Sequence, residues 1–71
     1  MVVVKLGEQL GKRLLKISKV AAETGISRTT LTSLYYRKAK GITLETLGTL
    51  CAYLNCSVAD LLEYVPEDGE K

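Results

Sequence analysis

The chain has 71 residues, of which 46% are apolar, and its formal net charge at pH 7 is +2. A chain of this length forms one domain with one small core, and it leaves little room for a deep catalytic cleft. The sequence contains no histidine, and it shows no cluster of metal ligands, no glycine-rich phosphate loop and no nucleophile beside a base. We therefore expect a protein that is not an enzyme and that uses no metal and no cofactor.

The charges are unevenly distributed along the chain. Residues 1–44 contain nine basic and two acidic residues, a net charge of +7, whereas residues 45–71 contain one basic and six acidic residues, a net charge of −5. A molecule with this polarity can turn its positive half towards phosphate groups while its acidic end faces away. The alternative is that some of these lysines belong to ordinary solvated helix faces.

The two ends of the chain are suited to extended backbone. Met1–Val4 is apolar and β-branched, and Glu63–Val65 is compatible with a strand before Pro66, so the ends can pair as a small sheet within one chain or across a dimer. A frayed N-terminus is the alternative. Because the apolar stretch before Lys5 is far shorter than a membrane span of about 20 residues or a signal-peptide core of about 7 to 15, we expect a cytoplasmic chain with no membrane contact.

The first predicted helix covers residues 6–14. Leu6, Leu10 and Leu14 recur at four-residue spacing and therefore share one face. Two glycines in this segment each weaken the helix by up to about 1 kcal/mol relative to alanine. Packing against the rest of the chain must therefore hold this helix in place.

The second predicted helix covers residues 17–24 and ends before Gly25. Val20 and Ala21 lie four to five residues before the glycine, where a short helix must touch the next one, and Ala21 is small enough to permit a close approach. Gly25 stands where the chain must take a left-handed conformation, which costs a residue with a Cβ on the order of 1 kcal/mol or more.

The third predicted helix covers residues 28 to about 37. Ile26 is expected to insert into the core, and the hydroxyl of Ser27 is expected to cap the helix. Leu31 and Leu34 are three residues apart and share its inner face. The side chains of the first turn therefore remain on the outer face.

The fourth predicted helix follows the loop 38–42, begins after a Thr43 cap and ends at Asn55, which tolerates left-handed backbone. Cys51 in this helix and Cys56 beyond it are expected to be buried free thiols. A disulfide is the alternative, and a metal site is disfavoured because two thiolates do not complete a tetrahedral shell. The apolar residues of this helix are expected to form a core stripe: Leu44, Leu47, Leu50, Cys51 and Leu54.

A fifth helix is predicted after Ser57. Ser57 and Asp60 have the spacing of a capping box, in which each side chain bonds the backbone N–H of the other residue. The residues expected to close the core before Pro66 stops the helix are Val58, Leu61 and Leu62.

Two segments in this order carry a resemblance to a known family. Val20–Leu34 reads VAAETGISRTTLTSL and continues into LYY and a basic loop, and the later segment reads GITLETLGTLCAYLNCSVADLLEYVP. Over roughly Leu6–Val65 the chain resembles the Cro- and phage-repressor-type (xenobiotic-response-element-like) helix-turn-helix DNA-binding regulators. An ordinary helix-turn-helix hairpin with no DNA role is the alternative.

The resemblance implies a fold and a division of the chain. The expected fold is all-α, a compact five-helix lambda-repressor-like domain whose second and third helices form the helix-turn-helix. The chain then consists of an N-terminal extended segment (1–5), the DNA-binding domain (6–65) and an acidic flexible tail (66–71). The expected partner is double-stranded DNA.

Base-reading residues are expected in the first turn of the third helix, because only there do side chains reach base edges in the major groove. We expect Arg28 to contact the O6 and N7 atoms of a guanine, a pairing worth about 1 to 3 kcal/mol of discrimination. A salt link to a phosphate is the alternative for Arg28. The other candidates are Thr29 and Ser33, then Thr32 at the edge of that surface, and Ser27, for which capping alone is a sufficient explanation.

Phosphate contacts are expected on both sides of that surface. The N-terminus of the second helix offers free backbone N–H groups and a favourable dipole, and the loop after the third helix is basic. We expect about half of these candidates to contribute to binding: Lys16, Lys19, Tyr36, Arg37, Lys38 and Lys40.

The chain departs from the wider family's pattern at three positions. Ile17 stands where relatives often have a glutamine that clamps a phosphate, and Lys16 is a candidate replacement. Leu10 and Tyr35 stand where many relatives pair an arginine with a glutamate. We expect an apolar contact there, which need not lower stability.

The function expected from these residues is a sequence-specific transcriptional regulator that binds a palindromic operator as a homodimer. One helix-turn-helix buries too little surface for tight binding, and a two-fold dimer presents two recognition helices about 34 Å apart. Candidate dimer surfaces are the N-terminal strand, the fifth helix and the acidic tail from Glu67. The alternative is a protein-interaction module, such as an antitoxin or an accessory factor, that holds a partner protein through its acidic C-terminus.

Overall fold

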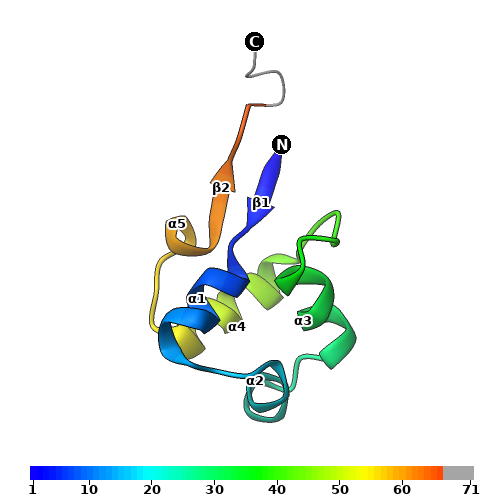
Figure 1. Cartoon of the computed structure of the whole chain (residues 1–71), viewed down its shortest axis with the longest axis vertical. Helices are drawn as coiled ribbons and strands as arrows, with labels where there is room; N and C mark the ends of the chain where they lie inside the picture. The colour runs from blue at the N-terminus through cyan, green and yellow to red at the C-terminus, as the bar shows by residue number, and fades with distance from the viewer. Residues whose placement is uncertain (67–71) are drawn as a thin grey trace.

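The computed structural model describes residues 1–66, which form five helices and two short strands. The helices gather in one cluster, and the strands form a ribbon that projects from one end of it (Figure 1). The fold is therefore all-α with one small antiparallel sheet, as the sequence predicts. The elements are β1 (Val2–Val4), α1 (Leu6–Arg13), α2 (Ile17–Thr24), α3 (Arg28–Tyr35), α4 (Leu44–Leu54), α5 (Val58–Leu61) and β2 (Leu62–Tyr64).

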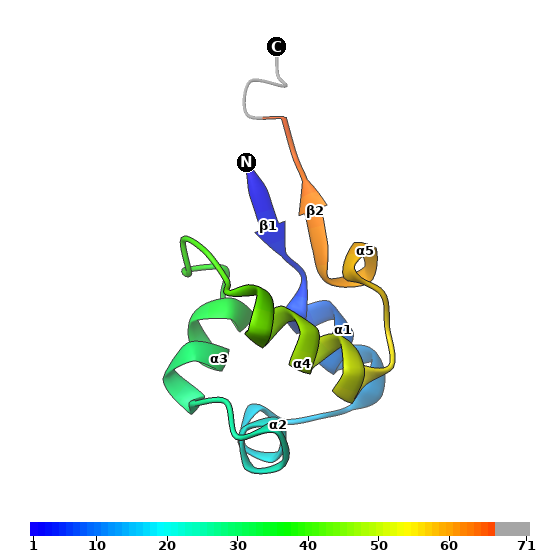
Figure 2. The same cartoon turned by 180° about the vertical axis from the view of Figure 1, so that it is seen from behind.

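The two ends of the chain pair with each other, which confirms the predicted sheet in its form within one chain. β1 lies antiparallel to β2 with Val3 opposite Glu63. The backbone N–H of Lys5 donates to the carbonyl of Leu61 at 2.7 Å, where the ribbon meets the helices. The view from behind shows the same ribbon rising beside α5 (Figure 2).

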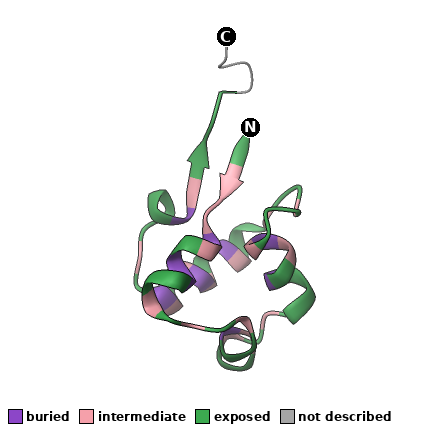
Figure 3. Ribbon diagram, viewed as in Figure 1, coloured by how far each residue is buried: buried purple, intermediate pink, exposed green. Residues whose placement is uncertain are grey.

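The core of the described chain lies between the helices (Figure 3). Every helix contributes to it, because each presents apolar residues at helical spacing on one face. Ile26 is half-buried and packs against this core, as predicted. The buried residues are Leu6, Leu10, Val20, Leu31, Leu34, Leu47, Leu50, Leu54 and Leu61.

The predicted helix caps are confirmed. The side chain of Ser27 accepts the N–H of Thr30, and the side chain of Thr43 accepts the N–H of Thr46. Asn55 ends α4 with a left-handed φ of 54°. The capping box at the start of α5 is complete, because the side chains of Ser57 and Asp60 each accept the backbone N–H of the other residue.

Three apolar residues that the sequence pattern groups with buried ones are exposed in the structure. Leu14 is 90% exposed, because α1 ends at Arg13 and Leu14 turns into left-handed backbone, away from the face of Leu6. Leu44 is 84% exposed, because it is the first residue of α4 and no described element covers that end. Val58 is 50% exposed at the start of α5. Each has the right spacing but lies at a helix terminus, beyond the neighbouring helices.

Two helix ends also differ from the prediction. α3 ends at Tyr35 and not near Arg37, because Arg37 has a left-handed φ of 59°. The backbone N–H groups of Lys38 and Ala39 then donate to the carbonyl of Ser33, at 2.8 and 3.2 Å. α5 ends at Leu61 because Leu62 already has extended backbone and begins β2. Pro66 is therefore not the residue that stops the helix.

A polar junction ties α1 to the ends of α4 and α5. The buried amide of Gln9 donates to the carbonyl of Asp60 at 3.0 Å. Arg13 donates to the Gln9 side-chain oxygen at 2.6 Å and to the carbonyl of Leu54 at 2.9 Å. These bonds satisfy carbonyl groups at the end of α4 and inside α5, which would otherwise lack partners.

The cysteines are free and half-buried, and both pack against the core. Burial raises the pKa of the Cys56 thiol. Within residues 1–66, no helix has the length and hydropathy to cross a bilayer. The predicted acidic tail begins at Pro66, and its residues 67–71 lie outside the described residues.

Candidate nucleic-acid interface

The turn between α2 and α3 is built by local hydrogen bonds. Gly25 has φ +82° and its N–H donates to the carbonyl of Ala21 at 3.0 Å. The hydroxyl of Thr24 donates to the carbonyl of Val20 at 2.7 Å and accepts the N–H of Ile26 at 3.2 Å. These bonds fix the angle at which α3 leaves α2, and they leave the first turn of α3 exposed.

A shallow hollow of about 340 Å³ lies between the N-terminus of α2 and the outer face of α3. It brings together residues that are up to twenty-one positions apart in the chain, including the predicted base-reading Arg28 and the predicted phosphate contacts Lys16 and Tyr36. Arg28 is exposed and makes no hydrogen bond or ion pair with any of residues 1–66. The lining residues are Leu15, Lys16, Ile17, Ser18, Arg28, Tyr35 and Tyr36.

The N-terminus of α2 opens into this hollow without a side-chain cap. Its cap residue, Lys16, has extended backbone and makes no capping bond, and the first turn of α2 contains no acidic residue. Backbone N–H groups at an uncapped helix start, together with the positive end of the helix dipole, favour an anion. A phosphate oxygen is therefore a suitable ligand at this edge of the hollow.

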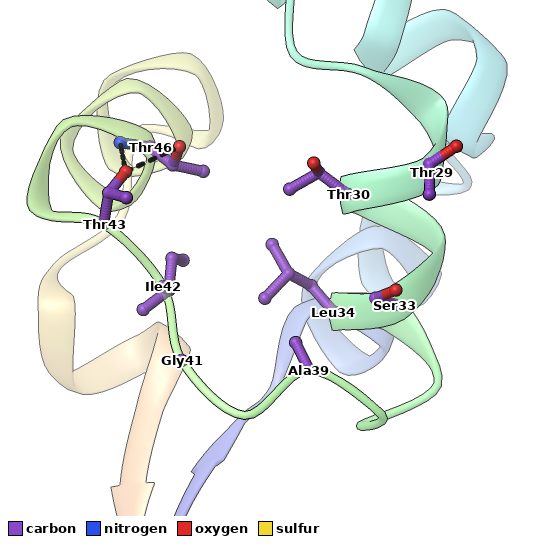
Figure 4. Close-up of a pocket in the computed structure, with 9 residues that line it drawn as sticks. All are labelled: Thr29, Thr30, Ser33, Leu34, Ala39, Gly41, Ile42, Thr43 and Thr46. Atoms are coloured by element: carbon purple, nitrogen blue, oxygen red, sulfur yellow. Dashed lines mark hydrogen bonds between the residues drawn. The ribbon is translucent and has the colours of Figure 1, made fainter.

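A second groove, of about 360 Å³, lies between α3 and the start of α4. Thr29 and Ser33 lie one turn apart along α3, and Thr30 and Leu34 point across the groove towards Ile42 and Thr46 (Figure 4). Thr29 and Ser33 lie at the rim of this groove, with their hydroxyl groups directed away from Ile42 and Thr46 (Figure 4). Thr32, the remaining base-reading candidate, is exposed.

Two of the predicted phosphate contacts have acidic partners within the chain. The guanidinium of Arg37 forms an ion pair with Glu8 of α1. The ammonium of Lys19 lies 3.3 Å from the carboxylate of Glu23, which also accepts the hydroxyl of Tyr53. The Tyr53 bond, followed by Lys19, lowers the pKa of Glu23, and the same bond raises the pKa of Tyr53. The charges of Lys19 and Arg37 are therefore partly offset by carboxylates of the same chain.

The other basic candidates, Lys38 and Lys40, are exposed on the loop after α3. Tyr36 is also exposed, whereas Tyr35 is half-buried and packs against the core, as expected. The two rings meet edge to face with centroids 4.9 Å apart. A Cβ at Gly7 would lie 3.4 Å from the carbonyl oxygen of Tyr35, so the glycine permits the close approach of α1 and α3.

Sequence reasoning missed several residues of these surfaces. Ser18 lines the hollow, and its position in the first turn of α2 was a signal that could have identified it. Thr43 was expected only as the cap of α4, and Thr46 was not singled out, yet both line the groove. The Glu8–Arg37 pair joins α1 to the turn after α3, and no local signal predicts it.

The chain belongs to the family of Cro/C1-type HTH DNA-binding domains, whose family model matches residues 5–67. Among known proteins it is similar to an uncharacterized HTH-type transcriptional regulator, YozG, from Bacillus subtilis (strain 168). The two are 33% identical over 63 residues, which cover 89% of this chain and 75% of the relative. The match spans α1 to α5 and so includes both surfaces described above.

Proposed function

We propose that this chain is a sequence-specific transcriptional regulator that reads the major groove of double-stranded DNA with α3. The observation that carries the proposal is the hollow in which Arg28 meets the uncapped start of α2. A residue that reads a base and a helix end that binds a phosphate must lie side by side, because base edges and backbone phosphates are adjacent in the groove. Membership of a DNA-binding family supports the same assignment.

In this proposal the outer face of α3 provides specificity. Arg28 has no internal partner among residues 1–66 and can present both terminal nitrogens to guanine O6 and N7. Thr29 and Ser33 border the second groove and supply hydroxyl or methyl contacts, with Thr32 at the edge. Ser27 is occupied as the cap of α3 and contributes mainly through the position it gives the helix.

The phosphate contacts in this proposal fall into two groups. Lys16, Tyr36, Lys38 and Lys40 lie exposed around the hollow and the following loop and bind phosphate directly. Lys19 and Arg37 contribute less, because a neighbouring carboxylate partly offsets the charge of each. α5 and β2, which carry Asp60 and Glu63, lie at the far end of the molecule from α2 (Figure 1), so these charges favour an orientation in which that end faces away from DNA.

We further propose that two copies bind a palindromic operator, with residues 6–65 as the DNA-binding domain. One α3 contacts only a few base pairs, whereas specific protein–DNA interfaces usually bury about 1,000 to 2,500 Å² of protein surface. A two-fold dimer doubles the contact and places the second recognition helix about 34 Å away, one turn of B-DNA.

The proposal is tested by selection from a random duplex DNA library at about physiological salt, followed by sequencing of the bound pool. We expect a palindrome with half-sites about ten base pairs apart. The Arg28→Ala variant should lose about 1 to 3 kcal/mol of discrimination, roughly a 5- to 150-fold preference, at one guanine of each half-site.

Lys12→Ala is the matched control, because Lys12 is an exposed cation on α1 near Asp60, at the other side of the helix cluster. It removes the same charge as Arg28→Ala and should leave the selected sequence unchanged. Enrichment of no sequence by the parent chain, with its fold intact, would overturn the proposal and favour the protein-interaction module instead.

A further inference from the structure

The ribbon of β1 and β2 extends an apolar face beyond the helices. Val4 and Leu62 are opposite each other and pack against the core. The next pair on the same face, Val2 and Tyr64, lies one step further out and is 61% and 68% exposed. Because side chains alternate along a strand, this exposed pair continues the buried face, yet no described element covers it.

The outer edge of β1 also offers unpaired backbone groups. Met1 and Val65 exchange backbone hydrogen bonds, and the N–H of Lys5 donates to Leu61, so these positions of the first strand face β2. In an antiparallel pair the bonded and non-bonded positions alternate. The N–H and C=O groups of Val2 and Val4 therefore point away from β2, towards the open edge of the two-stranded sheet.

A groove of about 290 Å³ runs along this edge. Its other side comes from α3 and the loop that follows it, and both views place this loop on the β1 side of the ribbon and α5 on the β2 side (Figures 1 and 2). The side chains that line the groove are apolar apart from that of Arg37, whose guanidinium is paired with Glu8. It is lined by Met1, Val2, Val3, Val4, Leu34, Arg37 and Ala39.

We propose that this edge is the dimer interface, and that its occupant is β1 of a second copy of this chain. The two strands lie antiparallel across a two-fold axis at Val3. Val2 then exchanges backbone hydrogen bonds with Val4 of the partner subunit, and each ribbon places its apolar tip in the groove of the other copy. The two ribbons thus become one four-stranded sheet.

A second copy fits this edge because the strand is complementary to itself. The three residues of β1 have no charged side chain, so antiparallel self-pairing matches valine with valine along the strand. When two copies of β1 lie antiparallel, each outward N–H group of one strand faces an outward C=O group of the other. The apolar tip and the apolar groove occur on the same molecule, so one isologous contact covers both.

The area of this interface sets its expected strength. A three-residue strand and four exposed apolar side chains bury less than the roughly 1,200 Å² at the lower end of stable interfaces. The free dimer is therefore weak, and it becomes stable when an operator holds two copies side by side. The inference rests on the proposed function in one respect, because it assigns the surface for the homodimer proposed there.

The test uses the full chain without DNA. Amide hydrogen exchange and sedimentation equilibrium are measured from about 0.05 to about 1 mM, the range in which so small an interface associates. We expect the average mass to rise with concentration and the exchange of the Val2 and Val4 amides to slow several-fold. The amides of Val3 and Lys5 face β2 and should be protected at every concentration.

Val2→Pro is the decisive variant, because it removes an N–H that points outward and leaves the pairing of β1 with β2 intact. It should stay monomeric throughout the series with an unchanged helical spectrum. Val2→Thr keeps the β-branched shape and the N–H and should associate like the parent chain. Self-association that persists in Val2→Pro, or a parent chain that is still monomeric at about 1 mM, would overturn the inference.

Arg28→Ala separates this inference from the proposed function. It leaves the ribbon untouched, so it should self-associate normally while losing base discrimination. Conversely, Val2→Pro should still contact single half-sites with weaker overall affinity. Loss of DNA selection in the parent chain with intact self-association would reject the regulator and leave the interface standing.

Discussion

Gln9 and Arg13, at the junction of α1, α4 and α5, form hydrogen bonds with other groups of the chain, whereas Arg28 on α3 forms none with residues 1–66. The first pair bonds two carbonyl groups of distant segments and is partly or fully buried. Arg28 is exposed and has no hydrogen bond or ion pair with residues 1–66. A polar group satisfied inside the chain stabilises the fold, and a polar group without an internal partner remains open to a ligand.

The largest expected effect comes from breaking the junction. Gln9→Ala removes a buried amide that bonds Arg13 and the carbonyl of Asp60, so unsatisfied groups and a cavity remain. We expect a loss of about 3 kcal/mol in the free energy of unfolding, measured by urea denaturation. Arg28→Ala should change that free energy by less than about 0.5 kcal/mol. Equal losses in the free energy of unfolding for the two variants would contradict this difference between the junction and α3.

The contact between α1 and α3 gives the next largest effect. Tyr35 is half-buried, and its ring lies against Gly7 of α1. Tyr35→Ala should lower the free energy of unfolding by about 2 kcal/mol, less than a fully buried aromatic residue would lose. Tyr35→Phe should be near neutral, because the hydroxyl has no hydrogen-bond partner within residues 1–66. If Tyr35→Ala lowered the free energy of unfolding by less than about 1 kcal/mol, the packing of the Tyr35 ring would contribute no more than that of an exposed residue.

Replacing each of two glycines by alanine tests how backbone conformation contributes to stability. Gly25 has φ +82°, so Gly25→Ala should cost about 1 kcal/mol although the space around it is open. Gly48 lies inside α4, where an added Cβ would meet no atom within 4 Å. Gly48→Ala should therefore stabilise the chain by about 0.5 to 1 kcal/mol. Thermal unfolding of both variants tests the opposite signs, and the same sign for both would contradict this explanation.

The smallest effect concerns pH. The backbone N–H of Ser57, followed by its side chain, lowers the pKa of Asp60 below its ordinary value. The contribution of the capping box is therefore fully present above about pH 4, the pKa of an unfolded aspartate, and is lost as the pH falls through the lower, folded pKa. Urea midpoints between about pH 2 and 6 should show this loss. Asp60→Asn should flatten the curve, and an unaltered pH dependence would assign it to other carboxylates.

The local signals in the sequence predicted the helix caps and the turn correctly. Ser27, Thr43 and the pair of Ser57 and Asp60 were expected as caps, and the structure confirms each of them. A cap depends on one side chain and the N–H group two or three residues later, so the information is contained in a short stretch of sequence. The left-handed positions at Gly25 and Asn55 follow for the same reason.

Burial and side-chain partners could not be predicted in the same way. Leu14 and Leu44 have the spacing of core residues but lie where no neighbouring element reaches them. Arg37 was expected at a phosphate, and its acidic partner, Glu8, comes from α1, far away in the sequence. Periodicity identifies the apolar face of a helix, but it does not say how far the covering elements extend.

The sequence by itself determined the helix-turn-helix, its caps, its family and the opposite charges of its two halves, because those properties depend on residue types at short spacing. Only the tertiary structure decided that the two ends pair within one chain, and not across a dimer, and that Arg28 lies beside the start of α2. It also decided that an open strand edge borders an apolar groove. These are contacts between segments far apart in the chain, and their geometry depends on how the whole core packs.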